Sequence, residues 1–271
     1  MIHWDKTFQP GMAYVCLSRT QRLEDIYIVE SKDKFDPKSI HAHPDALIEN
    51  ERIHNEFEKL KLAQRQLFEN NFNISFLNIN RLKSHLEDVK GDPYLLKFEI
   101  IALAETWLKP SDAVEIPGYA GPQINQGNGK GLATFVKTDT YAQFQRFVNE
   151  KFSAIKVDIH NCRIIFVYLS KNAEWNELKL VLDDQINDEI KPIAIIGDMN
   201  FDTVEDNHPL KSYLDQKNFT QLVKNPTHER GRLIDHVYVN YMLFSKSPIC
   251  CQTPVYYSDH DIVTLHIPKE I

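Results

Sequence analysis

The feature that most constrains the fold is a set of short apolar runs, each followed at once by polar side chains. The clearest run covers residues 193–196 and leads into Gly197, Asp198 and Asn200. A run so short and so rich in β-branched residues predicts a buried strand rather than a helix. We expect Gly197 to let the chain turn sharply, so that Asp198 and Asn200 emerge at the carboxyl end of the strand, where open α/β sheets carry their chemistry.

Four further segments share this arrangement, at residues 74–80, 100–107, 233–239 and 258–265. Their polar residues are Asn78, Asn80, Glu105, Asp235, Asp259 and His260. Taken singly, Asp235 could cap a bend and His260 could be a satisfied core histidine. Taken together, they predict that side chains far apart in the sequence converge on one pocket.

Strands and helices alternate after residue 72. Strands are expected near residues 73–79, 99–104, 131–137, 152–159, 162–169, 192–197, 233–240 and 260–267. Helices are expected near residues 82–90, 174–188 and 207–217. The segment at 152–159 alternates apolar and polar residues, which is typical of a half-buried strand, whereas 164–169 is apolar nearly throughout, as a central strand would be.

In chain order, these five motifs resemble the exonuclease-endonuclease-phosphatase superfamily. This metal-dependent group contains DNase I, abasic-site endonucleases, retrotransposon endonucleases and inositol polyphosphate phosphatases. The resemblance covers about residues 73–271, and the order of five motifs makes it far more specific than any single one. It implies an α/β fold of the DNase I-like kind, a four-layer sandwich of two packed mixed sheets flanked by helices.

The resemblance also implies a metal-dependent hydrolase of phosphoester bonds. Its cofactor would be Mg²⁺, for which Mn²⁺ can substitute, because carboxylate and amide oxygens suit a hard cation. Glu105 would be the principal metal ligand, with Asn78, Asn80 and Asp259 close by. Many DNA-cleaving members carry an aspartate where Asn80 stands, so the site here has one negative charge fewer and is expected to bind Mg²⁺ more weakly.

The resemblance assigns catalytic roles to five further residues. Asp198 would orient or deprotonate the attacking water, and Asn200 would hydrogen-bond the scissile phosphate. His260 would bind the phosphate or the leaving group, held through its other ring nitrogen by Asp235. Tyr168, near the end of its strand, matches a phosphate-contacting tyrosine of the superfamily.

Charge limits how the chain can hold a nucleic acid. The formal net charge is −7, which argues against a bulk electrostatic grip on DNA. Local basic groups remain as candidate DNA contacts, namely Arg81, Arg230 and Arg232, although a merely solvated surface is the competing interpretation. Residues 197–206 contain no Lys or Arg, so the cluster of cations that a small polyphosphate demands is missing, and we predict DNA as the substrate.

The amino-terminal segment has another character. Residues 8–28 resemble the last conserved motif of Pif/RecD-like superfamily 1 helicases, in which Arg19 would reach toward the γ-phosphate of ATP. The chain holds no Gly-x-x-x-x-Gly-Lys-Ser/Thr loop to cradle the phosphates. We therefore expect residues 1–30 to be a helicase remnant of a transposon-derived polyprotein, present here as a hydrophobic strand pair with no nucleotide role, in either a truncated copy or a partial gene product. We expect residues 31–72 to be a connector with a solvent-facing helix over 46–68, and residues 73–271 to be the hydrolase domain.

Three functions from different classes compete on this evidence. We favour a Mg²⁺-dependent DNA endonuclease of a mobile element, since a helicase-like segment precedes an intact set of site residues. The alternatives are a phosphatase acting on inositol phosphates or another small phosphoester, and a decayed copy that only binds nucleic acid or a partner. The four cysteines show no zinc or disulfide spacing and no signal peptide or membrane-spanning run is evident, which predicts a reducing intracellular compartment, nucleus or cytoplasm.

Overall fold

The computed structural model describes residues 2–3, 28–29, 44–109, 111–125, 130–159, 162–171, 173, 175–186, 191–202 and 208–269. The chain divides into two compact units, residues 1–66 and 67–271. In the first, β1 (Ile2–His3) and β2 (Ile28–Val29) pair in parallel. The expected helicase remnant otherwise lies outside the described residues.

Helix α2 (Pro44–Asn70) fills most of the expected connector and extends beyond the predicted bounds at both ends. Its side chains from Ile48 to Gln66 are all exposed, and Ile53, Phe57 and Leu60 are each more than half exposed. The prediction of a solvent-facing helix is therefore confirmed for these residues. No helix in the described part of the chain is long and apolar enough to cross a membrane.

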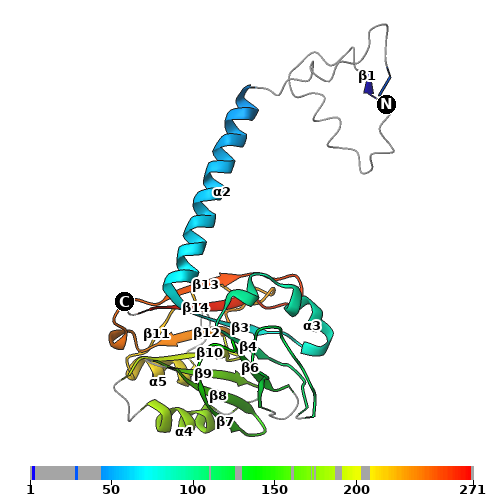
Figure 1. Ribbon diagram of the computed structural model, residues 1–271. Coiled ribbons are helices and arrows are strands. Elements are labelled where there is room, and N and C mark those ends of the chain that lie inside the picture. Colours follow the sequence, from blue (N-terminus) through cyan, green and yellow to red (C-terminus); the bar gives the residue numbers. More distant parts are fainter. Residues whose placement is uncertain are drawn as a thin grey trace. The chain divides into compact units, whose positions relative to one another are not determined.

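Two six-stranded mixed sheets form the second unit (Figure 1). The first has the order β13-β14-β3-β4-β6-β5, and its strands are β3 (Asn71–Asn78), β4 (Ile100–Ala104), β5 (Gln123–Asn125), β6 (Leu132–Val136), β13 (Ile249–Thr253) and β14 (Ile262–Pro268). The second has the order β11-β12-β10-β9-β8-β7, and its strands are β7 (Gln143–Val148), β8 (Phe152–Ile159), β9 (Cys162–Leu169), β10 (Ile193–Asp198), β11 (Thr220–Gln221) and β12 (Asp235–Val239).

The two sheets repeat one pairing pattern. Each has a parallel pair in its middle, β3 with β4 and β10 with β9, and every other neighbouring pair is antiparallel. Parallel neighbours end at the same edge of a sheet. The polar residues that follow β3, β4, β9 and β10 are thus brought in pairs to the edges of their sheets.

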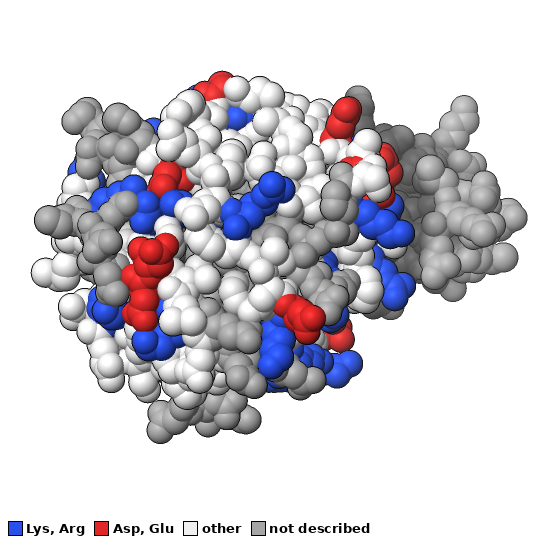
Figure 2. Space-filling view, turned by 90° about the horizontal axis from the view of Figure 1, so that it is seen from below, with Lys and Arg blue, Asp and Glu red and all other residues white. Residues whose placement is uncertain are grey.

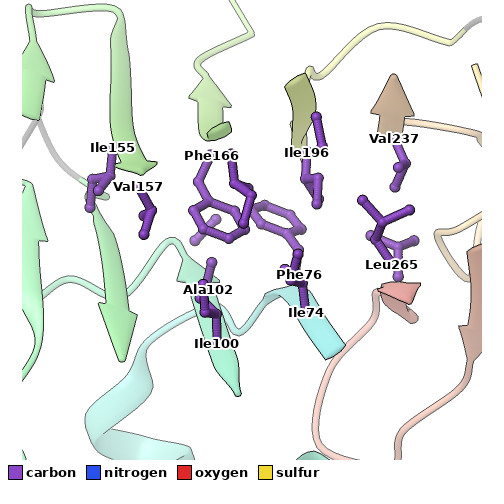
Figure 3. Packing of buried hydrophobic residues seen from close by; sticks show 14 of the residues in the cluster. Ile74, Phe76, Ile100, Ala102, Ile155, Val157, Phe166, Ile196, Val237 and Leu265 are labelled. Atoms are coloured by element: carbon purple, nitrogen blue, oxygen red, sulfur yellow. The ribbon is translucent and has the colours of Figure 1, made fainter. Parts of the chain in front are cut away.

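The inner faces of the sheets pack on each other through aliphatic and aromatic side chains. Figure 3 shows Phe76 of the first sheet beside Phe166 and Ile196 of the second, and Leu265 of the first sheet opposite Val237 of the second. All five are essentially inaccessible to solvent. Burial of so much apolar surface fixes the distance between the sheets, and with it the distance between residues at their common end.

Helices cover the outer faces and complete four layers (Figure 1). Helix α3 (Leu82–Gly91) and the short helix η4 (Leu95–Lys97) contribute Leu82, Val89 and Leu95 to the core beside the first sheet. Helices α4 (Trp175–Ile186) and α5 (Pro209–Gln216) pack Leu178 and Leu214 against the second sheet. A further short helix, η5 (Tyr241–Leu243), follows β12. The predicted α/β sandwich of two mixed sheets with flanking helices is confirmed.

Gly197 corrects one expectation. The chain does not turn there, because β10 continues through Asp198. A Cβ on Gly197 would lie 1.9 Å from the carbonyl oxygen of Val167 in the neighbouring β9. Glycine is required here for the close approach of two backbones and not for a bend.

Candidate active site

Three hydrogen bonds join the two sheets at one end of the sandwich. Asn78 Nδ2, at the end of β3, donates to Asp198 Oδ2, at the end of β10, over 2.9 Å. The Tyr168 hydroxyl of β9 donates to Glu105 Oε1, just after β4, over 3.1 Å. Because the sheets share one pairing pattern, each bond links strands at equivalent places, and the partners of these two bonds are 120 and 63 residues apart in the sequence.

The third link is the Asp235–His260 pair. Asp235 opens β12, His260 precedes β14, and His260 Nδ1 lies 2.8 Å from Asp235 Oδ2. The Nδ1–H donates to the carboxylate, which leaves Nε2 as the free ring nitrogen. Asp235 is 0 % exposed and His260 6 %, so the pair is held in an environment of low dielectric constant, in which the attraction between opposite charges is strong.

Asp235 has a second partner, Thr227, that the sequence reasoning missed. The Thr227 hydroxyl donates to Asp235 Oδ2 over 2.6 Å and accepts the backbone N–H groups of Asp235 and Ile234. In the described part of the chain Asp235 Oδ1 is buried with no hydrogen-bond partner. Thr227 therefore fixes one carboxylate oxygen and leaves the other available to a ligand.

Ser258 is another positioning residue that was missed as such, although it stands in a recognised motif. Its hydroxyl donates to the backbone carbonyl of Asn78 over 2.6 Å and accepts the N–H of His260 over 3.0 Å. It thus ties the loop that carries His260 to the end of β3. The only sign of this positioning role in the sequence is a serine two residues before a histidine.

Asn200 lies beside Asp198 but is turned toward the protein. Its backbone N–H donates to Asp198 Oδ1 over 2.9 Å, and its side-chain Nδ2 donates to the carbonyl of Leu169 over 2.6 Å. The amide group is therefore held at the edge of the site, between the ends of β9 and β10.

Two buried groups of the site, Asp198 and His260, have raised pKa values. Burial and the charge of Asp235 raise the pKa of Asp198 to about 7, against the opposing influence of His260. Burial also opposes the positive charge of His260, but Asp235, with Asp198 and Asp259, outweighs it and raises the pKa of His260 to about 9. At neutral pH the site thus holds an imidazolium beside a carboxylate that takes up a proton easily.

Glu105 has a cationic neighbour that was also missed. Lys130 Nζ lies 2.7 Å from Glu105 Oε2, while the other oxygen accepts the Tyr168 hydroxyl. Burial and the carboxylates of Glu105 and Asp198 raise the pKa of Tyr168 well above its usual range, so the tyrosine stays a neutral donor. Tyr168 is paired with Asp198 in the register of β9 and β10 and bonds to Glu105, so both acids lie at the same end of the sandwich.

Backbone strain is concentrated at this end. Among the residues that the structure describes, five non-glycine residues with positive φ follow β3, β4 and β10, and a sixth, Asn218, follows α5. The five are Asn80 at 42°, Arg81 at 81°, Glu105 at 51°, Trp107 at 56° and Asn200 at 53°. Such conformations persist only where the surroundings enforce them, and they gather at functional sites.

The remaining predicted site residues lie at the rim. Asn80 is exposed and donates its N–H to Asn78 Oδ1 over 3.2 Å. Asp259 is half-buried, with one oxygen 3.4 Å from His228 Nε2. Arg81 and Arg230 are exposed and Arg232 is half-buried; the arginines at 230 and 232 stand on a turn after His228, whose backbone bridges to His260.

The donor set fits a divalent cation. Asp198 is a buried carboxylate whose described partners are amide groups of Asn78 and Asn200, so no cation of the protein neutralises it through a hydrogen bond. A carboxylate buried in this way is stabilised by a bound cation. Among the described residues, two sets of side chains bring ligand atoms within 4.8 Å of one another, Asp198 with Asp235 and His260, and His228 with Asp259 and His260. Neither set includes Glu105, the expected principal ligand.

Comparison with known proteins gives the family. Residues 71–260 match the Endonuclease/Exonuclease/phosphatase family. This stretch is well over half of the chain, and the protein belongs to that family. Membership makes phosphoester hydrolysis, by a nuclease or a phosphatase, its class of activity. Comparison with curated proteins gives no match.

Solved structures agree on the fold. The endonuclease domain of TRAS1, a telomere-specific non-LTR retrotransposon, is 13% identical, with a TM-score of 0.51 over 73% of this chain and 98% of that one. The 3′ phosphatase NExo from Neisseria, bound to product DNA hairpin, is 15% identical, with a TM-score of 0.54 over 73% and 100%. An AP endonuclease from Archaeoglobus fulgidus is 15% identical, with a TM-score of 0.52 over 72% and 98%.

Proposed function

We propose that this protein is a Mg²⁺-dependent phosphodiesterase that cleaves DNA as an endonuclease. The observation that carries the proposal is the set of three hydrogen bonds between the sheets, Asn78 to Asp198, Tyr168 to Glu105 and His260 to Asp235. They gather an acceptor for a water proton, a cationic donor and a neutral donor at one place. Hydrolysis of a phosphodiester needs these groups together.

Each residue then has a task. Asp198, whose pKa of about 7 is close to neutrality, orients the attacking water and accepts its proton, because a base acts best near its own pKa. His260, with a pKa of about 9, presents Nε2–H to the phosphate or to the leaving oxygen. Asp235 and Thr227 hold the ring in place, and Tyr168 and Asn200 border the phosphate.

A cation would be held by the carboxylate of Glu105, with Asn78, Asn80 and Asp259 as the other expected oxygen donors, and oxygen ligands favour Mg²⁺ over softer metals. When bound, the cation supplies neutralisation of the charge on the phosphate and so lowers the barrier to attack. Lys130, 2.7 Å from Glu105, adds a positive charge on the same side.

DNA is favoured as the substrate by the distribution of basic side chains. The candidate contacts Arg81 and Arg230 come from loops after different strands, which suits two positions along an extended backbone. Figure 2 shows basic and acidic side chains interspersed on the face it presents, in keeping with a net charge of −7. Binding through a few local contacts should weaken as salt rises. The helicase-like segment at 8–28 supports an origin in a mobile element.

The test compares supercoiled plasmid with an inositol polyphosphate at equal Mg²⁺ and low salt. We expect nicking of the plasmid, abolished by EDTA and by Asp198→Asn, and retained by Asp215→Asn, which removes an exposed acid of α5 paired to Lys211. Phosphate release from the inositol polyphosphate without nicking would replace the endonuclease by a small-molecule phosphatase. Plasmid binding without hydrolysis of either substrate would indicate a binding module.

A further inference from the structure

Trp107 is exposed at the edge of the candidate active site. Its neighbours Thr106 and Leu108 are 1% and 2% exposed, whereas Trp107 is 45% exposed. Its φ of 56° is unusual for a bulky aromatic residue. The loop is held by a backbone hydrogen bond of 2.8 Å from Trp107 N–H to the carbonyl of Lys130. The fold thus presents a large aromatic ring to solvent in a strained conformation.

Arg81 covers part of this ring. The centre of its guanidinium lies 5.4 Å from the centroid of the Trp107 ring, within the range of a cation–π contact. Arg81 is also in the left-handed region, with φ of 81°, and its N–H donates to the carbonyl of Glu105 over 2.8 Å. Two strained residues from separate loops are therefore in contact. The N–H of Arg81 is bonded to the carbonyl of Glu105, and that of Trp107 to the carbonyl of Lys130.

We propose that Trp107 and Arg81 form a stacking platform for a nucleobase next to the scissile phosphate. This inference rests on the proposed function and specifies its substrate, a strand with an unstacked base beside the cleaved bond. Every base offers a π-face, so such a platform binds single-stranded or distorted DNA without reading its sequence. A small phosphoester presents no base to the ring.

The position of the platform agrees with this assignment. Trp107 is two residues beyond Glu105, and Arg81 is three beyond Asn78, so each follows a residue of the cross-sheet links within one turn of chain. We therefore expect a base attached to a phosphate held at those links to lie near the ring. The arginine adds a positive charge on the same side for the adjoining phosphate.

The test measures binding of a fluorescent single-stranded oligonucleotide by anisotropy, in EDTA so that cleavage plays no part. We expect Trp107→Ala to weaken binding about 5- to 100-fold, since stacking of one base on an aromatic ring supports an effect of that size. Trp107→Phe should stay within a few-fold of wild type. The control, Tyr141→Ala, removes a 78% exposed aromatic side chain from the loop after β6, at the opposite end of the strands, and should leave binding unchanged.

Two readouts separate stacking from charge and from misfolding. With an oligonucleotide of abasic sites, the difference between Trp107→Ala and wild type should vanish. Trp107→Ala should also leave the slope of log affinity against log salt unaltered, whereas Arg81→Gln should reduce it. In wild type, bound oligonucleotide should quench tryptophan fluorescence, and the quench should fall in Trp107→Phe although that variant still binds.

Equal affinity of wild type and Trp107→Ala for the base-containing strand would overturn the platform. If Trp107→Ala fails to fold, absence of a difference in quenching between wild type and Trp107→Phe would overturn it instead. These results do not depend on nicking. If the protein binds DNA in a base-dependent way but never nicks plasmid, the platform proposal stands and the endonuclease proposal is refuted. If it nicks plasmid and Trp107 has no effect on binding, the endonuclease proposal stands and the platform proposal is refuted.

Discussion

Asp235→Asn tests whether the carboxylate keeps His260 positively charged. The pKa of His260 stands at about 9 against an ordinary value of 6.5, although burial alone would lower it. Each unit of pKa corresponds to about 1.36 kcal/mol, so the folded environment as a whole favours the imidazolium by about 3 kcal/mol. Asp235, 2.8 Å away, provides most of this effect. Its replacement should bring the pKa of His260 close to 6.5.

The assay is a proton NMR titration of the His260 ring in metal-free protein, together with the pH dependence of plasmid nicking. Below pH 6.5 His260 is positively charged in both wild type and Asp235→Asn, so the variant should lose little activity there through loss of this charge. Between pH 6.5 and 9 only wild type retains it, and the deficit of Asp235→Asn should grow about tenfold per pH unit to 100-fold or more. Asp259→Asn removes a carboxylate with a weaker influence on His260, and it should change the pKa of His260 by less than about one pH unit.

The charge of His260 should also stabilise the folded protein at low pH more than at high pH. Because the folded-state pKa lies above the unfolded value, the stabilisation is complete below about pH 6.5 and is lost as the pH rises through 9. Asp235→Asn should therefore cost most at pH 6 and least above pH 9 in urea unfolding. A wild-type His260 that titrates at or below 6.5, or an unchanged pKa in Asp235→Asn, would refute the reasoning.

Three other predictions concern buried groups. Gly197→Ala should lower the free energy of unfolding by about 3 kcal/mol or more in urea, because its Cβ meets backbone at 1.9 Å, whereas Gly91→Ala, with open space, should be neutral or stabilising; equal effects would contradict the close approach. Burial lowers the pKa of His236 to about 4, so the unfolded chain binds a proton first and stability should fall by about 3 kcal/mol from pH 6.5 to 4; a fall undiminished in His236→Asn would exclude this cause. Thr227→Val should cost about 1–3 kcal/mol and reduce nicking, and Thr227→Ser should restore both; a Ser variant as poor as Val would show that the hydroxyl is not what matters.

The strands that the sequence predicted are those with long apolar runs. All eight strands predicted after residue 72 and the helices α3, α4 and α5 lie within a few residues of their expected positions. Burial on one or both faces of an element leaves a regular pattern of apolar residues in the sequence. The predictions omitted β5, β7, β11 and β13, which are the outermost strands of their sheets. Strand β7 is exposed or half-buried along its whole length, and such an edge strand carries little apolar signal.

The sequence predicted most residues of the candidate active site but not the residues that hold them in position. Asp198, Glu105 and His260 stand at strand ends, as their positions after apolar runs indicated. Thr227 and Lys130 were not found, because a lone threonine or lysine in a loop has no pattern that distinguishes it from a solvated residue. Only the geometry shows that one holds Asp235 and the other Glu105.

The sequence by itself determined which residues stand at the ends of buried strands, since local hydrophobicity decides where a strand begins and stops. Tertiary structure alone decided which of them meet. Asn78 bonds to Asp198 across 120 residues of chain, and that contact depends on how two sheets pack and on the register in each. Packing also decided that Gly197 serves a close approach, because the backbone of Val167 beside it belongs to a strand about 30 residues earlier.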